Sequence, residues 1–214
     1  MYLPTHFVQA DQAELTSLIT AHPLALLMHL GGDGTPEADP VPLHWRPSET
    51  GGQGGTLIGH VARANPLWRA AAGQSVLAVF QGPQAYISPN WYPSKQSEGG
   101  KVVPTWNYSV VQARGVLRLV EEPAELLKIL HTLTDQHESR QAHPWSVDDA
   151  PAGYIAALQK AIVGFRIEVS ELVGKWKVSQ NRPEADRQGV TAGLASASDT
   201  SAQAMARLVA GRPS

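Results

Sequence analysis

The sequence predicts a mainly β fold with inserted helices, an antiparallel barrel rather than a parallel dinucleotide-binding sheet. About seven short segments read as strands, and few of them alternate with helices in the way that parallel sheets require. Neither the Gly-x-Gly-x-x-Gly fingerprint nor the P-loop occurs in the sequence. The fold class is therefore α+β, with antiparallel strands as its main component.

The N-terminal part is predicted to hold one helix followed by a β-hairpin. Asp11 is a suitable N-cap for a helix over residues 12–22, which has one apolar face. A dense apolar run over 24–30, the turn sequence GGDGTP and a moderate alternation over 37–45 then predict the hairpin. A glycine-rich loop, TGGQGG, is expected to follow at 50–55.

The middle of the chain is predicted to contain three strands and two helices. Pro66 lies near the start of the first helix and Gly73 at its end, while acidic Glu121 and Glu122 precede the second. The strands cover residues 56–61, 75–81 and 109–120, and the second helix covers 123–137.

Beyond the second helix, the sequence predicts a brief helix, two strand-like pieces and a helical appendage. The first three cover residues 152–161, 162–172 and 174–179. After Asn181 the composition shifts to small and polar residues, and helices are expected around 183–189 and 200–209. We therefore predict a main domain over residues 1–182 and a C-terminal helical extension over 183–214.

The composition argues against several classes of protein. Seventeen basic and nineteen acidic residues give a formal net charge of −2, which is too little positive charge for a dedicated duplex binder. Cysteine is absent, which removes disulfides and thiolate zinc sites and favours a cytoplasmic protein. No basic leader precedes an apolar run, and the run at 24–28 is too short to cross a bilayer.

Neither a metal site nor a catalytic residue can be named from the sequence. The eight histidines lack the spacing and the neighbouring carboxylates of a metal site. The Gly-x-Ser-x-Gly elbow of serine hydrolases does not occur. Whether the protein is an enzyme therefore stays open.

Aromatic residues are concentrated between Phe80 and Tyr108. This segment holds six of the fourteen Phe, Trp and Tyr residues of the chain and four of its sixteen prolines. Rings on stiff loops form a wall suited to a flat, partly polar ligand, because ring faces stack while hydroxyl and N–H groups meet polar edges. A loop-rich minor core explains the same composition equally well.

Two polar segments are candidates for binding an anion. The sequence HVARANP, from His60 to Pro66, lies at a predicted strand-to-helix corner, where free backbone N–H groups and Arg63 suit a phosphate. Its structural alternative is that Asn65 caps the helix, Pro66 takes the first helical position and Arg63 points into water, which is favoured for these residues in isolation.

The second polar segment is GKWKVSQNR, from Gly174 to Arg182. Lys175, Lys177 and Arg182 are suited to clamp a phosphate, and Gln180 and Asn181 offer donors and acceptors to a flavin pyrimidine edge or a sugar chain. A basic, solvated edge strand explains the segment at least as well.

Five motifs together resemble the PaiB-type family of FMN-binding, negative transcriptional regulators of bacteria. They are MYLPTHF, HVARANPLW, FQGPQAYISPNWY, KVVPTWNY and GKWKVSQNR, and the resemblance covers about residues 1 to 190 in matching order. It implies an antiparallel split barrel of the FMN-binding type, assembled as a homodimer with FMN at the subunit interface. It also implies that flavin is contacted or supported by His60, Arg63, Asn65, Trp91, Trp106, Lys175, Gln180, Asn181 and Arg182, with the two tryptophans as ring neighbours.

Two functions follow from this resemblance. In the first, the protein is a redox-linked flavoprotein or a flavin-dependent oxidoreductase that acts on a small molecule without binding DNA. In the second, it is a repressor that binds DNA directly. The sequence gives the second little support, because the predicted helix over 200–209 offers only Arg207 and that over 123–137 only Lys128 and histidines.

Overall fold

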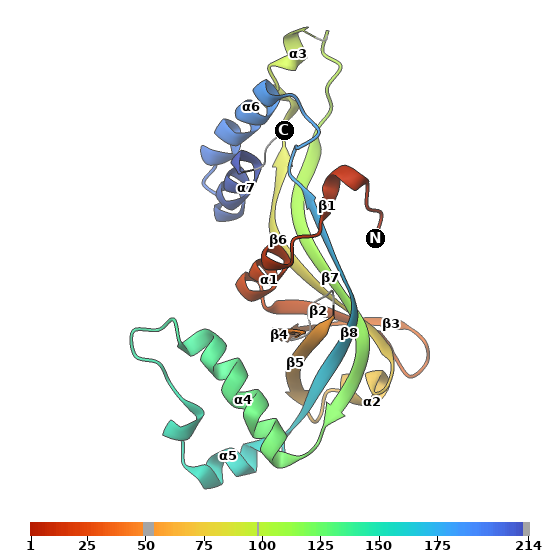
Figure 1. The fold of residues 1–214 in the computed structure, drawn as a ribbon, viewed down its shortest axis with the longest axis vertical. Coiled ribbons are helices and arrows are strands. Elements are labelled where there is room, and N and C mark those ends of the chain that lie inside the picture. The colour runs from red at the N-terminus through yellow and green to blue at the C-terminus, as the bar shows by residue number, and fades with distance from the viewer. Residues whose placement is uncertain (49–53, 98, 212–214) are drawn as a thin grey trace. The chain divides into compact units, whose positions relative to one another are not determined.

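The computed structural model describes residues 1–48, 54–97 and 99–211, and these form eight strands, seven helices and three short 3-10 helices (Figure 1). The loop predicted at 50–55 lies outside the described residues except for Gly54 and Gly55. The strands are β1 (Val8–Gln9), β2 (Leu24–Leu30), β3 (Pro36–Pro42), β4 (His44–Pro47), β5 (Gly55–Ala62), β6 (Ser75–Ile87), β7 (Thr105–Val120) and β8 (Ile162–Lys177). The helices are α1 (Gln12–Ala21), α2 (Leu67–Ala71), α3 (Ser94–Ser97), α4 (Pro123–Glu138), α5 (Ala152–Gln159), α6 (Glu184–Ala195) and α7 (Thr200–Ala210), with η1 (Thr5–Phe7), η2 (Pro89–Trp91) and η3 (Val147–Asp149).

The strands form one sheet in the order β3-β2-β6-β7-β8-β5-β4, and β1 pairs with β8 beside this path. Antiparallel pairing is seen, for example, between β5 and β8, where Gly55 lies opposite Val169 and Ala62 opposite Ile162. The path ends at β3 and β4, and these two strands do not pair within the described residues, so the sheet is open. The prediction of a mainly β, antiparallel fold with helices is confirmed.

The chain divides into two compact units. Unit 1 comprises residues 1–11, 81–111 and 173–214, and unit 2 comprises residues 12–80 and 112–172. The three longest strands, β6, β7 and β8, each contribute residues to both units. Each unit is therefore described by itself below.

The core of unit 2 lies between the sheet and the helices α1 and α4. On β2, Ala25 and Leu27 are fully buried while their neighbours in the strand are exposed. Helix α4 covers β5, where Ile129 and Leu133 pack against Ile58. Fully burying an aliphatic side chain of this size stabilises a protein by about 1.5–3 kcal/mol. The helix predicted over 123–137 is confirmed by this packing.

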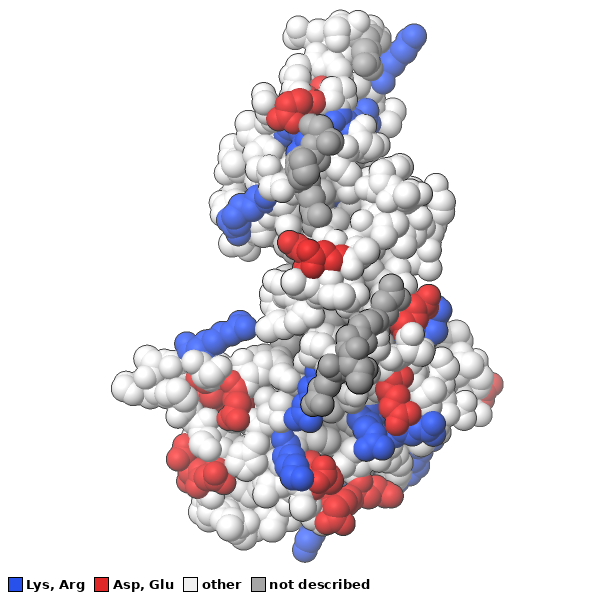
Figure 2. Space-filling view, in the orientation of Figure 1, with Lys and Arg blue, Asp and Glu red and all other residues white. Residues whose placement is uncertain are grey.

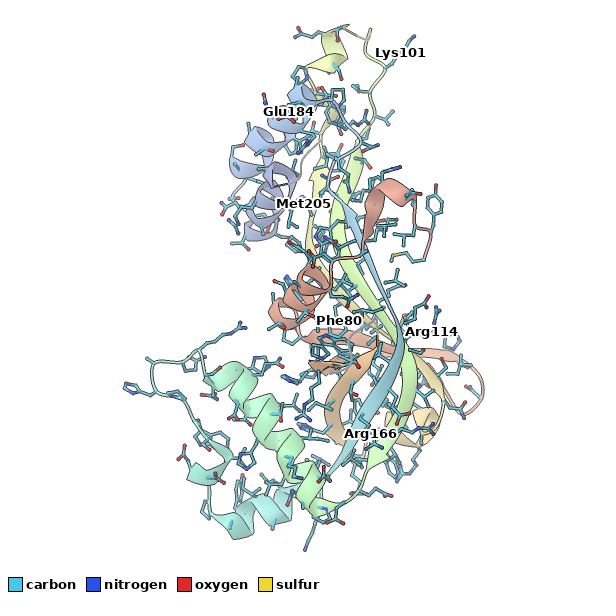
Figure 3. The ribbon with its side chains drawn as sticks, viewed as in Figure 1. Phe80, Lys101, Arg114, Arg166, Glu184 and Met205 are labelled. Atoms are coloured by element: carbon cyan, nitrogen blue, oxygen red, sulfur yellow. The ribbon has the colours of Figure 1, made fainter. Side chains whose placement is uncertain are left out.

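Unit 1 contains the two C-terminal helices, which lie side by side (Figure 1). Val190 and Leu194 of α6 and Met205 and Val209 of α7 are buried, and Figure 3 labels Met205 on α7. Asp199 caps α7, because its carboxylate accepts hydrogen bonds from the backbone N–H groups of the helix's first turn. Two helices were predicted here, and the first of them ends at Ala195 rather than near residue 189.

The described part of the chain has no helix that combines the length and the apolar character needed to cross a membrane.

Three strands are longer than the sequence analysis predicted. Strand β6 continues to Ile87 through Gly82 and Pro83, and β7 begins at Thr105 instead of residue 109. The pieces predicted over 162–172 and 174–179 form the single strand β8. Because Ala85 and Ile87 are buried while Tyr86 is exposed, burial alternation continues beyond Pro83. Several aromatic residues assigned to loops, Tyr86 and Trp106 among them, therefore lie on strands.

Candidate functional site

The end of β8 leads into a constrained turn in unit 1. Ser179 has a backbone φ of 64°, in the left-handed region that non-glycine residues rarely adopt. Its Oγ accepts a hydrogen bond from Asn107 Nδ2 at 2.9 Å, and its carbonyl accepts one from the Arg182 N–H at 3.0 Å. Asn107 and Ser179 are both buried. Because such a backbone conformation costs free energy and is held here by buried contacts, the turn is a candidate for a functional constraint.

Gln180 holds this turn to the N-terminal segment. Its Nε2 donates to the carbonyls of His6, at 2.9 Å, and Trp176, at 2.6 Å, while its Oε1 accepts from the Val178 N–H at 2.8 Å. The side-chain amide is thus engaged with three backbone groups. Gln180 consequently positions the turn, whereas the side chain of Asn181 next to it is exposed.

Lys175, Lys177 and Arg182 form a cationic group in unit 1, and none of them makes an ion pair within the described residues. Lys175 is only 6% exposed, its Nζ donates to the Tyr2 carbonyl at 3.0 Å, and β1 pairs alongside it. The rings of Tyr2, Phe7 and Tyr108 lie between 5.2 and 5.9 Å from this ammonium. The alternative of a solvated edge strand therefore does not describe Lys175.

Lys177 and Arg182 are the more accessible members of this group. The Lys177 ammonium donates to Thr105 Oγ1 and, at 2.6 Å, to the carbonyl of Trp106. Arg182 lies over the ring of Tyr92, 4.8 Å from its centroid. Burial lowers the pKa of Lys177, and the positive charges of Lys175 and Arg182 lower it further. An anion beside Lys177 would offset this repulsion.

A pocket of about 540 Å³ lies in unit 1 and brings the two predicted tryptophans together. Trp91 and Trp106 line it with Tyr86, and residues of α6 and α7 complete it. Tyr86 and Trp106 meet edge to face, with ring centroids 6.1 Å apart, and their residues are 49% and 54% exposed. Rings that are this exposed beside a pocket are available to stack on a planar ligand.

Trp91 is fixed in this pocket by two glycines of α6. A Cβ atom on Gly193 would lie within 2.8 Å of Trp91 Cγ, and one on Gly189 would lie closer than 3.0 Å to the Trp91 carbonyl oxygen. The two glycines are four residues apart and so lie on the same face of the helix. Helix α6 can therefore approach the tryptophan only because both side chains are absent.

The other predicted residues, His60, Arg63 and Asn65, lie in unit 2. Arg63 donates from Nε to the Lys160 carbonyl at 2.8 Å and from Nη2 to the Ile162 carbonyl at 2.9 Å. These bonds tie the end of β5 to the start of β8. The side chain of Arg63 also lines a cavity of about 330 Å³.

Asn65 lies at the start of α2, but the N-cap residue of this helix is Pro66 rather than Asn65. Its Oδ1 accepts from the Leu67 N–H at 2.8 Å, and its Nδ2 donates to Asp39 Oδ1 at 3.1 Å. On β5, burial lowers the pKa of His60, and its buried Nδ1 finds no hydrogen-bond partner among the residues that the structure describes. The side chains of Arg63 and Asn65 therefore make hydrogen bonds inside unit 2 that hold the strand-to-helix corner in place.

A further cavity of unit 2, of about 440 Å³, is lined by charges of both signs. Arg46, Lys128 and Arg166 face it together with Glu121, Glu122 and Glu125, and Figure 3 labels Arg166 on β8. Lys128 is paired with Glu125 at 2.6 Å. Because these charges compensate one another, this cavity is a poorer anion site than the group of Lys175, Lys177 and Arg182, which make no ion pair with any described residue.

The arrangement in unit 1 is suited to a planar ligand with an anionic end. The carboxylate of Asp199 also lines the aromatic pocket and would repel an anion there. The anionic end of the ligand is therefore better placed beside Lys177 than inside the pocket. Among the residues that the structure describes, no three His, Asp or Glu side chains gather as a metal site. The sequence analysis missed Tyr86 as a site residue and the contribution of α7. The concentration of aromatic residues between Phe80 and Tyr108, which includes Tyr86, was the available signal.

Comparisons with known proteins bear on the family of this chain. Residues 1–171 match the model of a family described as an FMN-binding domain. The chain is 31% identical over 210 residues to the protease synthase and sporulation protein PAI 2 of Bacillus subtilis, covering 98% of this chain and 96% of that protein. It is also 31% identical over 241 residues to an uncharacterized protein of Emericella nidulans, with the same coverage of both chains.

A solved structure supports the same fold. The FAD and heme binding protein from Mycobacterium smegmatis aligns with a TM-score of 0.57 and 19% sequence identity, covering 87% of this chain and 80% of that one. At this identity the likeness concerns the fold, an FMN- or FAD-binding split barrel with an open sheet.

Proposed function

This chain belongs to the PaiB-type family of FMN-binding proteins, and from that premise we propose that unit 1 holds the flavin, with its ring in the aromatic pocket. FMN is the cofactor of this family. One observation carries the proposal: Lys177 donates to the backbone of Trp106. An ammonium that makes no ion pair in the described part of the chain therefore lies beside a residue whose exposed ring lines the pocket, and both belong to unit 1. A cation beside an aromatic wall matches a flat ring with a phosphate tail.

The roles of the predicted residues are proposed from their contacts. Trp91 and Trp106, with Tyr86, form the wall for the ring, while Lys177 and Arg182 face the phosphate and Lys175 raises the local positive potential. Asn181 is exposed at the turn and available to a polar edge of the ligand. Gln180 supports the turn through its three backbone contacts. His60, Arg63 and Asn65 are proposed as the supporting group of unit 2.

We propose a redox-linked flavoprotein that acts on a small molecule. When bound, FMN supplies hydride or electron transfer, and the protein contributes binding and electrostatics. The cations of unit 1 would hold the phosphate end, and the pocket would shield one ring face from water. No residue is assigned as an acid or base.

The proposed assembly is a homodimer, as the resemblance implies, with flavin at the subunit interface. The negative regulatory role implied by the resemblance is proposed to be indirect. Of the candidate recognition helices, α7 carries Arg207 as its only Lys or Arg and α4 carries only Lys128. On the face drawn in Figure 2, basic and acidic side chains of the described residues are interspersed. A sequence-specific, salt-sensitive gel shift with the purified protein would contradict this indirect role.

Flavin uptake tests the proposal directly. The purified protein, stripped of bound small molecules, is expected to take up FMN with quenching of flavin fluorescence and a shifted visible spectrum. Riboflavin, which lacks the phosphate, should bind more weakly because the cations then have no partner. Failure to bind FMN at micromolar concentrations would contradict the proposed function.

The pKa of Lys177 predicts how FMN affinity depends on pH. An anion binds the protonated ammonium, and burial lowers the pKa of this group below the ordinary lysine value of 10.5. FMN affinity should therefore fall as the pH rises through this lowered pKa, at a lower pH than that at which an ordinary lysine loses its proton. Fluorescence titrations from about pH 7 to pH 10 measure this fall. Lys177→Arg should move it to higher pH because guanidinium stays charged, and identical profiles for both proteins would refute the assignment.

A further inference from the structure

A cavity of about 330 Å³ in unit 2 lies where α4 and α5 meet the ends of β5, β7 and β8. Most of the side chains that line it are apolar, among them Val120 of β7, Leu126 of α4 and Val163 of β8, and the cations Arg63 and Lys160 line it as well. Its volume falls within the range of small-molecule pockets, about 300–1,000 Å³. Every lining residue belongs to unit 2, so the cavity shares no residue with the aromatic pocket of unit 1.

Helix α5 lines this cavity through Ala156 and Gln159 and yet buries none of its own residues. Its sequence, AGYIAALQ, is mainly apolar, and Tyr154 and Leu158 are more than 40% exposed. Gln159 Nε2 donates to the Pro123 carbonyl at 3.0 Å, which holds α5 beside the start of α4 (Figure 1). A helix of this composition normally buries one apolar face. An apolar molecule in the cavity would supply such a contact on the side of α5 where Ala156 lies.

Two cations line the cavity, and both keep N–H donors that no described residue uses. Arg63 donates from Nε and Nη2 to the carbonyls of Lys160 and Ile162, whereas its Nη1 has no hydrogen-bond partner among the described residues. The Lys160 ammonium likewise makes no ion pair within the described part of the chain. Because two bonds fix the guanidinium of Arg63, its remaining donors are oriented in advance for a carboxylate.

One carboxylate, that of Glu121, also lines the cavity and would repel an anion. Glu121 lines the neighbouring cavity of about 440 Å³ too, where three cations offset its charge. Arg63 and Lys160, in contrast, line the smaller cavity and not the larger one. The charges at the smaller cavity therefore favour an anion over a cation.

We propose that this cavity is a second small-molecule site, which binds a monocarboxylic acid with an apolar body. The body would lie against Val120, Leu126 and Val163, beside α5, and the carboxylate would meet Arg63 and Lys160. Arg63 keeps its bonds to the two carbonyls, so it still holds the corner while it binds the acid. This site goes beyond the proposed function, because it lies in unit 2 and does not need flavin. A strongly polar ligand is disfavoured, since most of the wall has no polar group to receive it.

Octanoate, octan-1-ol and octylamine are the probes, because they share one apolar chain and differ in charge. Calorimetric titration of the full chain is expected to show that octanoate binds at least about tenfold more tightly than either of the other two. Lys160→Gln should weaken octanoate binding by about 2- to 5-fold, the effect of an exposed ion pair, and leave octan-1-ol binding unchanged.

A second pair of variants tests the location of the site. Ala156→Phe places a ring on a residue that lines the cavity, so octanoate and octan-1-ol should both bind at least about tenfold more weakly. Ala157→Phe is the matched control, because Ala157 is the next residue of α5, is exposed and does not line the cavity. Both variants should keep the wild-type circular dichroism, since α5 buries none of its residues.

Three results would overturn this site. They are failure of the wild type to bind octanoate at millimolar concentrations, equal loss of octanoate binding in Ala156→Phe and Ala157→Phe, and tighter binding of octylamine than of octanoate. FMN titration at saturating octanoate gives a further test: unchanged FMN affinity supports two separate sites, and competition would overturn the second site. Octanoate binding by a protein that does not bind FMN contradicts the proposed function alone and supports the acid site.

Discussion

Replacing Lys177 with glutamine is expected to weaken FMN binding by about 10- to 100-fold, because hydrogen bonds to charged groups contribute about 1.5–3 kcal/mol. The Lys177 ammonium contacts Thr105 and the carbonyl of Trp106 and makes no ion pair within the described residues. Glutamine keeps a donor for these contacts but removes the charge that would meet the phosphate. Fluorescence titration of FMN into stripped protein measures the loss.

Riboflavin separates loss of the charge from general damage. The Lys177→Gln variant should bind riboflavin about as well as the wild type does, because riboflavin has no phosphate. Lys101→Gln is the matched control, since Lys101 is an exposed lysine of unit 1 (Figure 3) and does not line the aromatic pocket. Equal losses of FMN and riboflavin affinity in Lys177→Gln would show that the lysine shapes the pocket instead of binding phosphate.

Local sequence patterns predict much of the fold, but they do not predict the full lengths of its longest strands. The helix α4 and the strand β5 were predicted within a few residues, because apolar spacing and flanking signals agree there. Strand β6 was cut short because Gly82 and Pro83 read as a turn. The burial of Ala85 and Ile87, which carries the strand past this point, depends on neighbours that are distant in sequence.

For the site too, local sequence predicted some of the residues, but it did not predict the contacts made by residues that are distant in sequence. The sequence analysis selected Trp91 and Trp106, and the structure brings them to one pocket, but the helices that complete it follow about 80 residues later. It proposed that Gln180 contacts or supports the flavin, and in the structure the amide of Gln180 is occupied by backbone groups of its own turn and of His6. Hydrogen bonds of this kind cannot be derived from residue type, because they require knowledge of which backbone lies nearby.

Alanine at Gly193 is expected to destabilise the protein by about 1–3 kcal/mol, the usual cost of overpacking, even though alanine favours a helix over glycine by about 1 kcal/mol. The added Cβ would lie within 2.8 Å of Trp91 Cγ, so the indole or the helix must move. Gly189→Ala should cost more, because its Cβ meets the Trp91 carbonyl oxygen, a backbone atom that cannot rotate away. Chemical unfolding followed by circular dichroism measures both changes.

Gly153→Ala is the control for these two variants, since it makes the same change in helix α5 where a Cβ meets nothing within 4 Å. It should be neutral or stabilising by up to about 1 kcal/mol, because only helix propensity changes. Trp91 also lines the aromatic pocket, so Gly193→Ala should weaken riboflavin and FMN binding to a similar extent, unlike Lys177→Gln. A Gly193→Ala protein with wild-type stability and flavin affinity would mean that α6 does not hold the tryptophan in place.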